Sequence, residues 1–197
     1  MRIVPYYNPA PSVVTGLCCV HLKEGTPPLR REPGAEVWLE SYHAPAVLAE
    51  ARRGGGVTLN SLWLDAALWN AYDGSFDMFD RIVLMPYDPN EPERAYEDNV
   101  KLLLEWAAQH GIPRSRLTVD LCILPYSRRR DVEVYAARAG RLAETGLATV
   151  AGLDNLVFRE AGAKPLLERL IRLLDGSIEF GLISARYDKW AEGLCGK

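Results

Sequence analysis

Short apolar runs alternate with stretches of helical periodicity along most of this chain. The runs predict strands, because they are short, rich in aliphatic residues and bounded by turn-forming residues. Strands are expected at residues 2–7, 17–22, 35–41, 57–62, 80–87, 117–124, 147–157 and 177–184. Helices are expected at residues 44–53, 65–72, 93–110, 131–145, 164–174 and 187–194.

The clearest helix is the one expected over residues 93–110. Tyr96, Val100, Leu103 and Ala107 follow the spacing of a single apolar helix face. Gly111 comes directly after this stretch, where a helix commonly ends in a residue of left-handed conformation.

The first 34 residues differ from the rest of the chain. The connections at residues 8–16 and 23–34 are rich in proline and glycine and carry no helical period. Eight strands with two such connections predict an α/β fold: a compact (β/α)8 TIM-like barrel with shortened N-terminal helices. We expect a single domain over residues 1–197, with residues 1–34 as an irregular N-terminal part.

An open doubly wound sheet is the competing architecture. A dinucleotide-binding sheet of that type needs a glycine-rich turn between its first strand and a helix. The glycines at 54–56 come directly before a strand instead, so they do not qualify. This observation favours the barrel.

Composition narrows the function classes. The 197 residues are 48% hydrophobic and 25% charged, which is typical of a globular domain, and the formal net charge is −3. We therefore expect no nucleic-acid partner. The basic cluster at residues 128–130 is interpreted as a solvated loop end, with a phosphate or polyglutamate site as the alternative.

No apolar run approaches the ~20 residues that span a bilayer, and the N-terminus lacks a signal-peptide pattern. We expect a cytoplasmic protein with no membrane partner. The four cysteines form no C-x-x-C pair, and the three histidines lack the spacing of a zinc site. We expect no metal site.

Polar residues stand at the C-terminal ends of four short apolar runs, at residues 35–40, 57–60, 117–120 and 149–155: Glu40, Asn60, Asp120 and Asn155. The C-terminal strand ends of a parallel barrel face one side, where ligands bind. Carboxylate and amide groups gathered there suit a flat, nitrogen-rich heterocycle such as a pterin, whose ring edges carry both donors and acceptors. The alternative for each residue is a local turn or helix cap, and Asp88 has the same two interpretations.

Three segments resemble the methyltetrahydrofolate:corrinoid methyltransferases, which are pterin-binding TIM barrels like the dihydropteroate synthases. The segments are HGIPRSRLTVDLCILP at residues 110–125, TVAGLDNLVF at 149–158 and VTLNS at 57–61. The resemblance covers about residues 36–184. It implies pterin contacts from Asp120, Asn60 and Asn155, with Glu40 in place of an aspartate and Asn8 as a further candidate.

The resemblance also implies a reaction, namely methyl transfer from a methyltetrahydrofolate-like tetrahydropterin to a corrinoid protein. Asn155 would stabilise the N5-protonated pterin, acting with water or with a neighbouring carboxylate such as Asp154. The cobalamin-carrying motif D-x-H-x-x-G is missing from this chain, so the corrinoid is expected on a partner protein.

The sequence departs from the family pattern at several points. Leu121 replaces a proline, Asp154 replaces a serine, and the second strand ends in His21 and Leu22 where the family has Asp or Asn residues. Two hypotheses therefore stand: an active methyltransferase, and a non-catalytic scaffold subunit of a methyl-transfer complex. Shortened helices would expose apolar strand surface, so we expect a homodimer or a hetero-complex.

A third hypothesis is a dihydropteroate synthase-like enzyme. Its chemistry needs a basic site for a pterin pyrophosphate. The candidates for that site are Arg159, Lys164 and Arg186.

Overall fold

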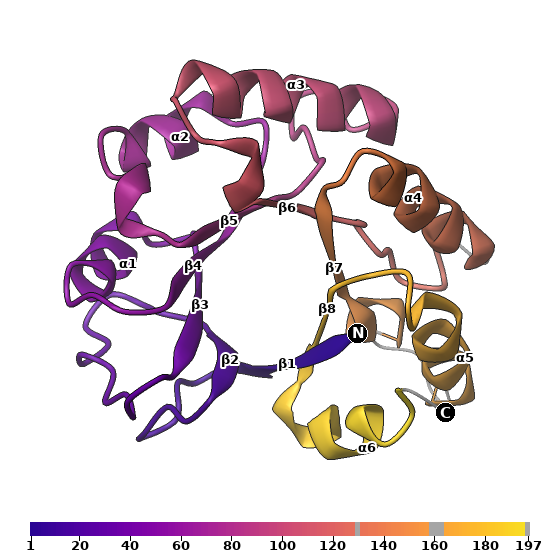
Figure 1. The fold of residues 1–197 in the computed structure, drawn as a ribbon, viewed down its shortest axis with the longest axis horizontal. Helices are drawn as coiled ribbons and strands as arrows, with labels where there is room; N and C mark the ends of the chain where they lie inside the picture. The colour runs from indigo at the N-terminus through magenta and orange to yellow at the C-terminus, as the bar shows by residue number, and fades with distance from the viewer. Residues whose placement is uncertain (129–130, 158–163, 196–197) are drawn as a thin grey trace. The chain divides into compact units, whose positions relative to one another are not determined.

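The computed structural model describes residues 1–128, 131–157 and 164–195. Eight strands follow one another in sequence order around a closed barrel, which confirms the predicted (β/α)8 class (Figure 1). The strands are β1 (Arg2–Tyr7), β2 (Leu17–Val20), β3 (Glu36–Glu40), β4 (Val57–Leu62), β5 (Arg81–Leu84), β6 (Leu117–Asp120), β7 (Ala148–Gly152) and β8 (Phe180–Ser184).

The α-helices are α1 (Ala44–Ala51), α2 (Ala66–Tyr72), α3 (Tyr96–Gln109), α4 (Glu133–Glu144), α5 (Lys164–Leu174) and α6 (Asp188–Glu192). Short 3-10 helices are η1 (Phe76–Met78), η2 (Arg114–Arg116), η3 (Leu153–Val157) and η4 (Ala185–Tyr187). Within the described ranges, none of the helices has the length and apolarity that crossing a bilayer requires.

The chain forms two compact units, and each is described by itself. The N-terminal unit is Tyr6–Thr118, and the C-terminal unit combines Met1–Pro5 with Val119–Lys197. Strands β1 and β6 each have residues in both units.

In the N-terminal unit, helices are missing where the sequence predicted their loss. Residues 8–16 and 21–35, all of which the structure describes, contain no helix. These connections still bury apolar side chains, namely Val14, Leu22 and Leu29. The second connection is held to α1 by the buried Glu50, which accepts a hydrogen bond from the backbone N–H of Leu29 (3.1 Å) and pairs with Arg31 (3.2 Å).

The remaining helices of this unit cover the outer side of its strands, with α1 and α2 lying outside β3 and β4 (Figure 1). An aromatic cluster fills the space around α2, η1 and α3. Trp69 lies edge-on to Trp106 at 5.7 Å and stacks on His110 at 5.2 Å between ring centroids. Gly111 has φ +70°, which agrees with the predicted end of α3.

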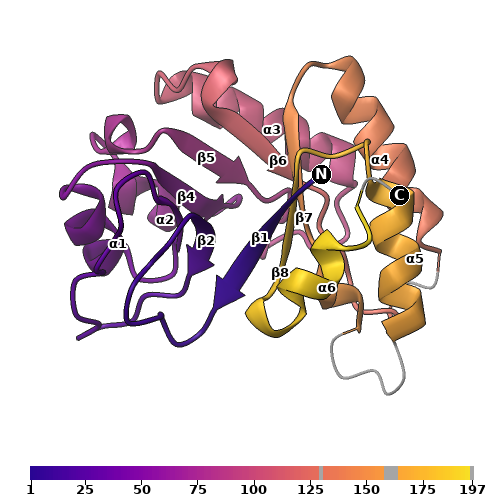
Figure 2. The same ribbon diagram turned by 60° about the horizontal axis from the view of Figure 1, so that its bottom comes forward.

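In the C-terminal unit, α4 and α5 pack side by side (Figure 2), with α4 against β7 and α5 against the 3-10 helix η3, which in turn contacts β8. Their buried stripes follow the predicted helical periodicity: Tyr135, Ala139 and Leu142 on α4, and Leu167, Leu170, Ile171 and Leu174 on α5. Helix packing therefore agrees with the sequence pattern here.

Two predicted strands of this unit end early. Strand β6 stops at Asp120, and Cys122 takes a left-handed conformation with φ +50°. The strand predicted over 147–157 stops at Gly152, and the next residues form η3. Leu153 and Leu156 are the buried residues of η3, so the apolar spacing there is three, the period of a 3-10 helix.

Candidate functional site

Glu40 and Asn60 lie side by side on adjacent strands of the N-terminal unit. Glu40 is the last residue of β3, and it pairs in register with Asn60 of β4. Strand β4 continues to Leu62, as predicted, with a cis Asn60–Ser61 peptide and a register shift, so Asn60 lies two residues before the end of its strand. The register brings these two predicted site residues together.

The carboxylate of Glu40 is held by two residues that sequence analysis did not select. Its Oε2 atom pairs with Nδ1 of His21 and accepts a hydrogen bond from the hydroxyl of Tyr6 (3.3 Å). The side chains of His21 and Glu40 are 19% and 16% exposed, so the pair is largely shielded from water. His21 follows β2, and its position at a predicted strand end was the signal that could have identified it.

Tyr6 and Cys19 remain protonated beside this carboxylate. Burial raises the pKa of the Tyr6 phenol, and the nearby charge of Glu40 raises it further. Burial and the same charge raise the pKa of the Cys19 thiol, although a hydrogen bond from Asn60 opposes the shift. The Nδ2 atom of Asn60 lies 3.6 Å from Cys19 Sγ, so its amide group faces the buried thiol.

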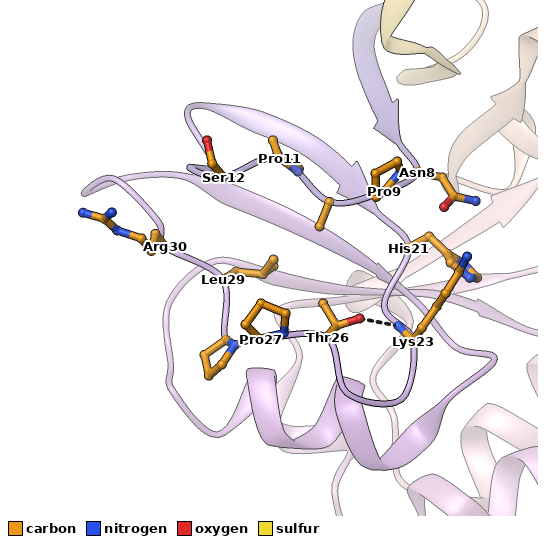
Figure 3. Close-up of a pocket in the computed structure, with 12 residues that line it drawn as sticks. Asn8, Pro9, Pro11, Ser12, His21, Lys23, Thr26, Pro27, Leu29 and Arg30 are labelled. Carbon is orange, nitrogen blue, oxygen red and sulfur yellow. Dashed lines mark hydrogen bonds between the residues drawn. The ribbon is translucent and has the colours of Figure 1, made fainter.

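A cleft of about 400 Å³ opens beside His21, between the two proline-rich connections. Figure 3 shows Asn8, His21 and Lys23 gathered at one part of this cleft, with Arg30 and Ser12 at another. Prolines from both connections form much of its wall, and no acidic residue is among those that line it. The backbone N–H of Lys23 donates to Thr26 Oγ1 (2.8 Å), which closes the turn below the cleft (Figure 3).

Aromatic rings extend from His21 along the next strand ends. Tyr42, which is 66% exposed, lies 6.2 Å from the His21 ring and 5.6 Å from the Trp63 ring, measured between centroids. This arrangement gives His21 a partly apolar surrounding.

Asp88 is buried in a different environment. Its carboxylate pairs with Arg94 (2.7 Å) and accepts hydrogen bonds from the backbone N–H groups of Asn90 (2.8 Å) and Glu91 (3.3 Å). These contacts hold the turn after β5, in agreement with the local alternative for this residue.

In the C-terminal unit, Asp120 is the last residue of β6. Its Oδ1 atom accepts a hydrogen bond from the backbone N–H of Cys122 at 2.7 Å. Burial raises the pKa of Asp120 to about 6, and the hydrogen bond from Cys122 only partly opposes this shift. This perturbed carboxyl group keeps Asp120 among the candidate site residues.

Asp154 and Asn155 lie in η3, not on a strand. Asp154 accepts a hydrogen bond from the backbone N–H of Ser184 at 3.0 Å. Burial raises the pKa of Asp154, while Ser184 and the charge of Arg186 lower it. The exposed Asn155 packs over Gly152, where an added Cβ would lie 2.6 Å from its Nδ2 atom.

Of the three basic residues proposed for a phosphate site, the structure describes Lys164 and Arg186. Arg159 lies outside the described residues, as do positions 129 and 130 of the arginine cluster. Lys164 lies 4.8 Å from the centroid of the Trp190 ring, and Arg186 lies 4.7 Å from that of Tyr187. Across the described ranges, no group of three or more His, Cys, Asp or Glu side chains is placed to hold a metal ion.

No protein-family model matches the sequence, and no curated protein matches it. Solved structures do match. The dihydropteroate synthase of Yersinia pestis, solved with a pterine-sulfa conjugate, has a TM-score of 0.61 at 10% identity over 98% of this chain and 91% of its own.

Two further dihydropteroate synthases have similar scores. That of Xanthomonas albilineans, solved with 4-aminobenzoic acid, has a TM-score of 0.57 at 17% identity over 82% of this chain. That of Vibrio fischeri ES114 has a TM-score of 0.56 at 12% identity over 81%. This chain spans 63% and 65% of those two proteins. At such identities the likeness establishes the fold, which does not by itself carry an activity.

Proposed function

We propose that this protein binds a methylated tetrahydropterin of the methyltetrahydrofolate type and transfers its methyl group to a corrinoid held by a partner protein. The observation that carries pterin binding is the Glu40–Asn60 pair on adjacent strands, in which Glu40 pairs with His21, a residue that lines a cleft of about 400 Å³. Cavities of roughly 300–1,000 Å³ hold ligands of this size.

The donor and acceptor pattern supports this ligand class. A carboxylate can accept about four hydrogen bonds, and Glu40 uses Oε2 for both contacts described above. An amide such as that of Asn60 both donates and accepts, which matches a mixed edge of the pterin ring. Asp120, with its raised pKa, is proposed as a second anchor for the amino-pyrimidine edge.

Two further observations support the proposal. The fold is that of the dihydropteroate synthases, of which one is solved with 7,8-dihydropteroate and another with a pterine-sulfa conjugate. The finer assignment to methyl transfer comes from the sequence resemblance over residues 110–125 and 149–158.

In the proposed reaction, N5 of the pterin must gain a proton before it can leave. Asn155 would stabilise that protonated nitrogen, and Asp154 would accept a hydrogen bond near it. The corrinoid supplies the nucleophile that takes up the methyl group. The protein supplies binding and orientation, which can provide much of the rate.

The corrinoid in this reaction is carried by a second protein. We propose a corrinoid protein as partner and a homodimer or hetero-complex as the assembly. Light scattering at micromolar concentration checks the assembly, and a monodisperse monomer that stays monomeric when mixed with a corrinoid protein would contradict it.

The test of pterin binding is calorimetric titration with methyltetrahydrofolate. We expect micromolar affinity, weakened about tenfold or more by Asp120→Asn and by Asn60→Leu, because hydrogen bonds to a bound ligand contribute about 1–3 kcal/mol. Asp98→Asn, which removes an exposed carboxylate from the first turn of α3, is the matched control and should bind like wild type. Absence of binding by the wild-type protein would refute the proposal.

The fold likeness favours one alternative, a dihydropteroate synthase-like enzyme. Incubation with a pterin pyrophosphate and 4-aminobenzoate decides between the two. Formation of dihydropteroate would establish the alternative, whereas methyl transfer to a Co(I) corrinoid would establish the proposed reaction. Folate binding without either reaction would indicate the scaffold subunit.

A further inference from the structure

His21 lines the cleft, and its ring is paired with a carboxylate that is largely shielded from water. Its Nδ1 atom pairs with Glu40, and the residue lines the cleft between the proline-rich connections (Figure 3). The ring therefore joins a carboxylate on one side to a ligand-sized cavity on the other. Nε2 is the ring nitrogen that this pair does not use.

Glu40 is itself fixed in position, which matters for the orientation of the imidazole. The hydroxyl of Tyr6 donates to the same Oε2 atom, and the raised pKa of Tyr6 keeps that donor protonated. A carboxylate that holds one imidazole nitrogen selects the tautomer of the ring and stabilises its protonated form. The arrangement is that of an oriented acid–base group.

The other groups around His21 fit this interpretation. Tyr42 contributes an aromatic ring, Lys23 lines the same cleft, and Cys19 lies near Glu40 with a thiol that stays protonated. Glu40 is thus the group that pairs with the imidazole, while Lys23 adds positive charge to the ligand side.

We propose that His21 exchanges a proton with the ligand in this cleft and that Glu40 is its positioning residue. The inference rests on the proposed function, and it deepens that function by naming the source of the proton that N5 requires. In the step, the imidazolium of His21 gives its proton to the N5 lone pair. The bond from N5 to the methyl carbon then breaks and leaves its electron pair on N5. The methyl group passes to the nucleophile, which supplies both electrons of the new bond, and solvent reprotonates His21.

The first test uses His21→Gln, which removes the imidazole ring but keeps a side-chain amide beside Glu40. We expect affinity for methyltetrahydrofolate within about threefold of wild type, and single-turnover methyl transfer to a Co(I) corrinoid slowed by about 10²–10⁴-fold. The limb of the pH–rate profile that depends on a protonated group should disappear. Lys101→Gln, which removes an exposed positive charge on α3 away from the cleft, is the control and should keep that limb.

A second variant separates acid–base chemistry from a structural role. His21→Ala should be slow in methyl transfer, and added imidazole should restore part of the rate. Unchanged rate and pH profile in His21→Gln, together with no rescue of His21→Ala, would overturn the inference while leaving the proposed function intact. Failure of the wild-type protein to bind methyltetrahydrofolate would overturn both.

A readout that does not depend on turnover is nuclear magnetic resonance of the histidine rings. The chain has only three histidines, His21, His43 and His110. Saturating methyltetrahydrofolate should shift the ring signals of His21, while those of His110, which stacks on Trp69, should stay in place. A His21 signal that does not respond to bound folate would count against contact with the ligand.

Discussion

Replacing Asp120 with asparagine should stabilise the protein at neutral pH. Burial raises the pKa of this carboxyl from its ordinary value of 3.8 to about 6 in the folded state. The folded state therefore holds the proton more tightly than the unfolded chain does. The stability that protonated Asp120 contributes is present below about pH 3.8 and is lost as the pH rises through about 6.

The size of the effect follows from the same two values. A shift from 3.8 to about 6 corresponds to roughly 3 kcal/mol, at about 1.4 kcal/mol for each pH unit. Asparagine avoids this cost because it is neutral, and its side-chain oxygen can still accept the hydrogen bond from the backbone N–H of Cys122. We expect Asp120→Asn to raise the free energy of unfolding by about 1–3 kcal/mol near pH 7.5, and by less than about 1 kcal/mol near pH 4.

Urea unfolding of the wild type and of Asp120→Asn at both pH values measures the difference. Asp98→Asn serves as the control for removal of an exposed charge and should show little pH dependence relative to wild type. If Asp120→Asn is the less stable protein at neutral pH, the carboxylate is stabilised by its surroundings and the argument from burial fails. A gain in stability combined with a loss of folate binding would be typical of a residue retained for function.

Two further predictions concern the connections of the N-terminal unit. Gly56→Ala should lower the free energy of unfolding by about 2 kcal/mol or more, because φ is +54° and the new Cβ would lie 2.9 Å from a backbone oxygen. Gly54→Ala, at φ +80° with open space around the new Cβ, should lower it by about 1 kcal/mol. Thermal unfolding compares the two variants, and equal losses would contradict the steric argument. Glu50→Gln should lower the free energy of unfolding, measured with urea, by about 3 kcal/mol, because it breaks the buried ion pair with Arg31. Glu168→Gln, in an exposed pair, should stay within about 0.5 kcal/mol, and similar losses in both would show that burial of Glu50 is unimportant.

The alternation of strands and helices was readable because each element has its own hydrophobic period. Strand β4 and helix α5 were predicted with the bounds that the structure has, and Gly111 and Gly146 both have positive φ where helix ends were expected. The absence of helices in residues 8–16 and 21–35 also followed from composition, because proline and glycine are poor helix formers.

Strand ends were less predictable. An apolar run continues past Gly152 into η3, and the same apolar residues serve a strand or a 3-10 helix. The choice depends on what packs against them, and here η3 contacts α5 and β8. Asp154 and Asn155 therefore lie on a short helix and not at the end of a strand.

The sequence by itself determined the class of fold and the positions of Glu40, Asn60 and Asp120 at or near strand ends, because periodicity is a local property of the chain. Only the tertiary structure decided which side chains meet. Tyr6 and His21 reach Glu40 from two other strand ends, across 34 and 19 residues of sequence. Likewise, the raised pKa of Asp120 comes from burial. Such contacts depend on strand register and on the packing of distant segments, which no local pattern of residues specifies.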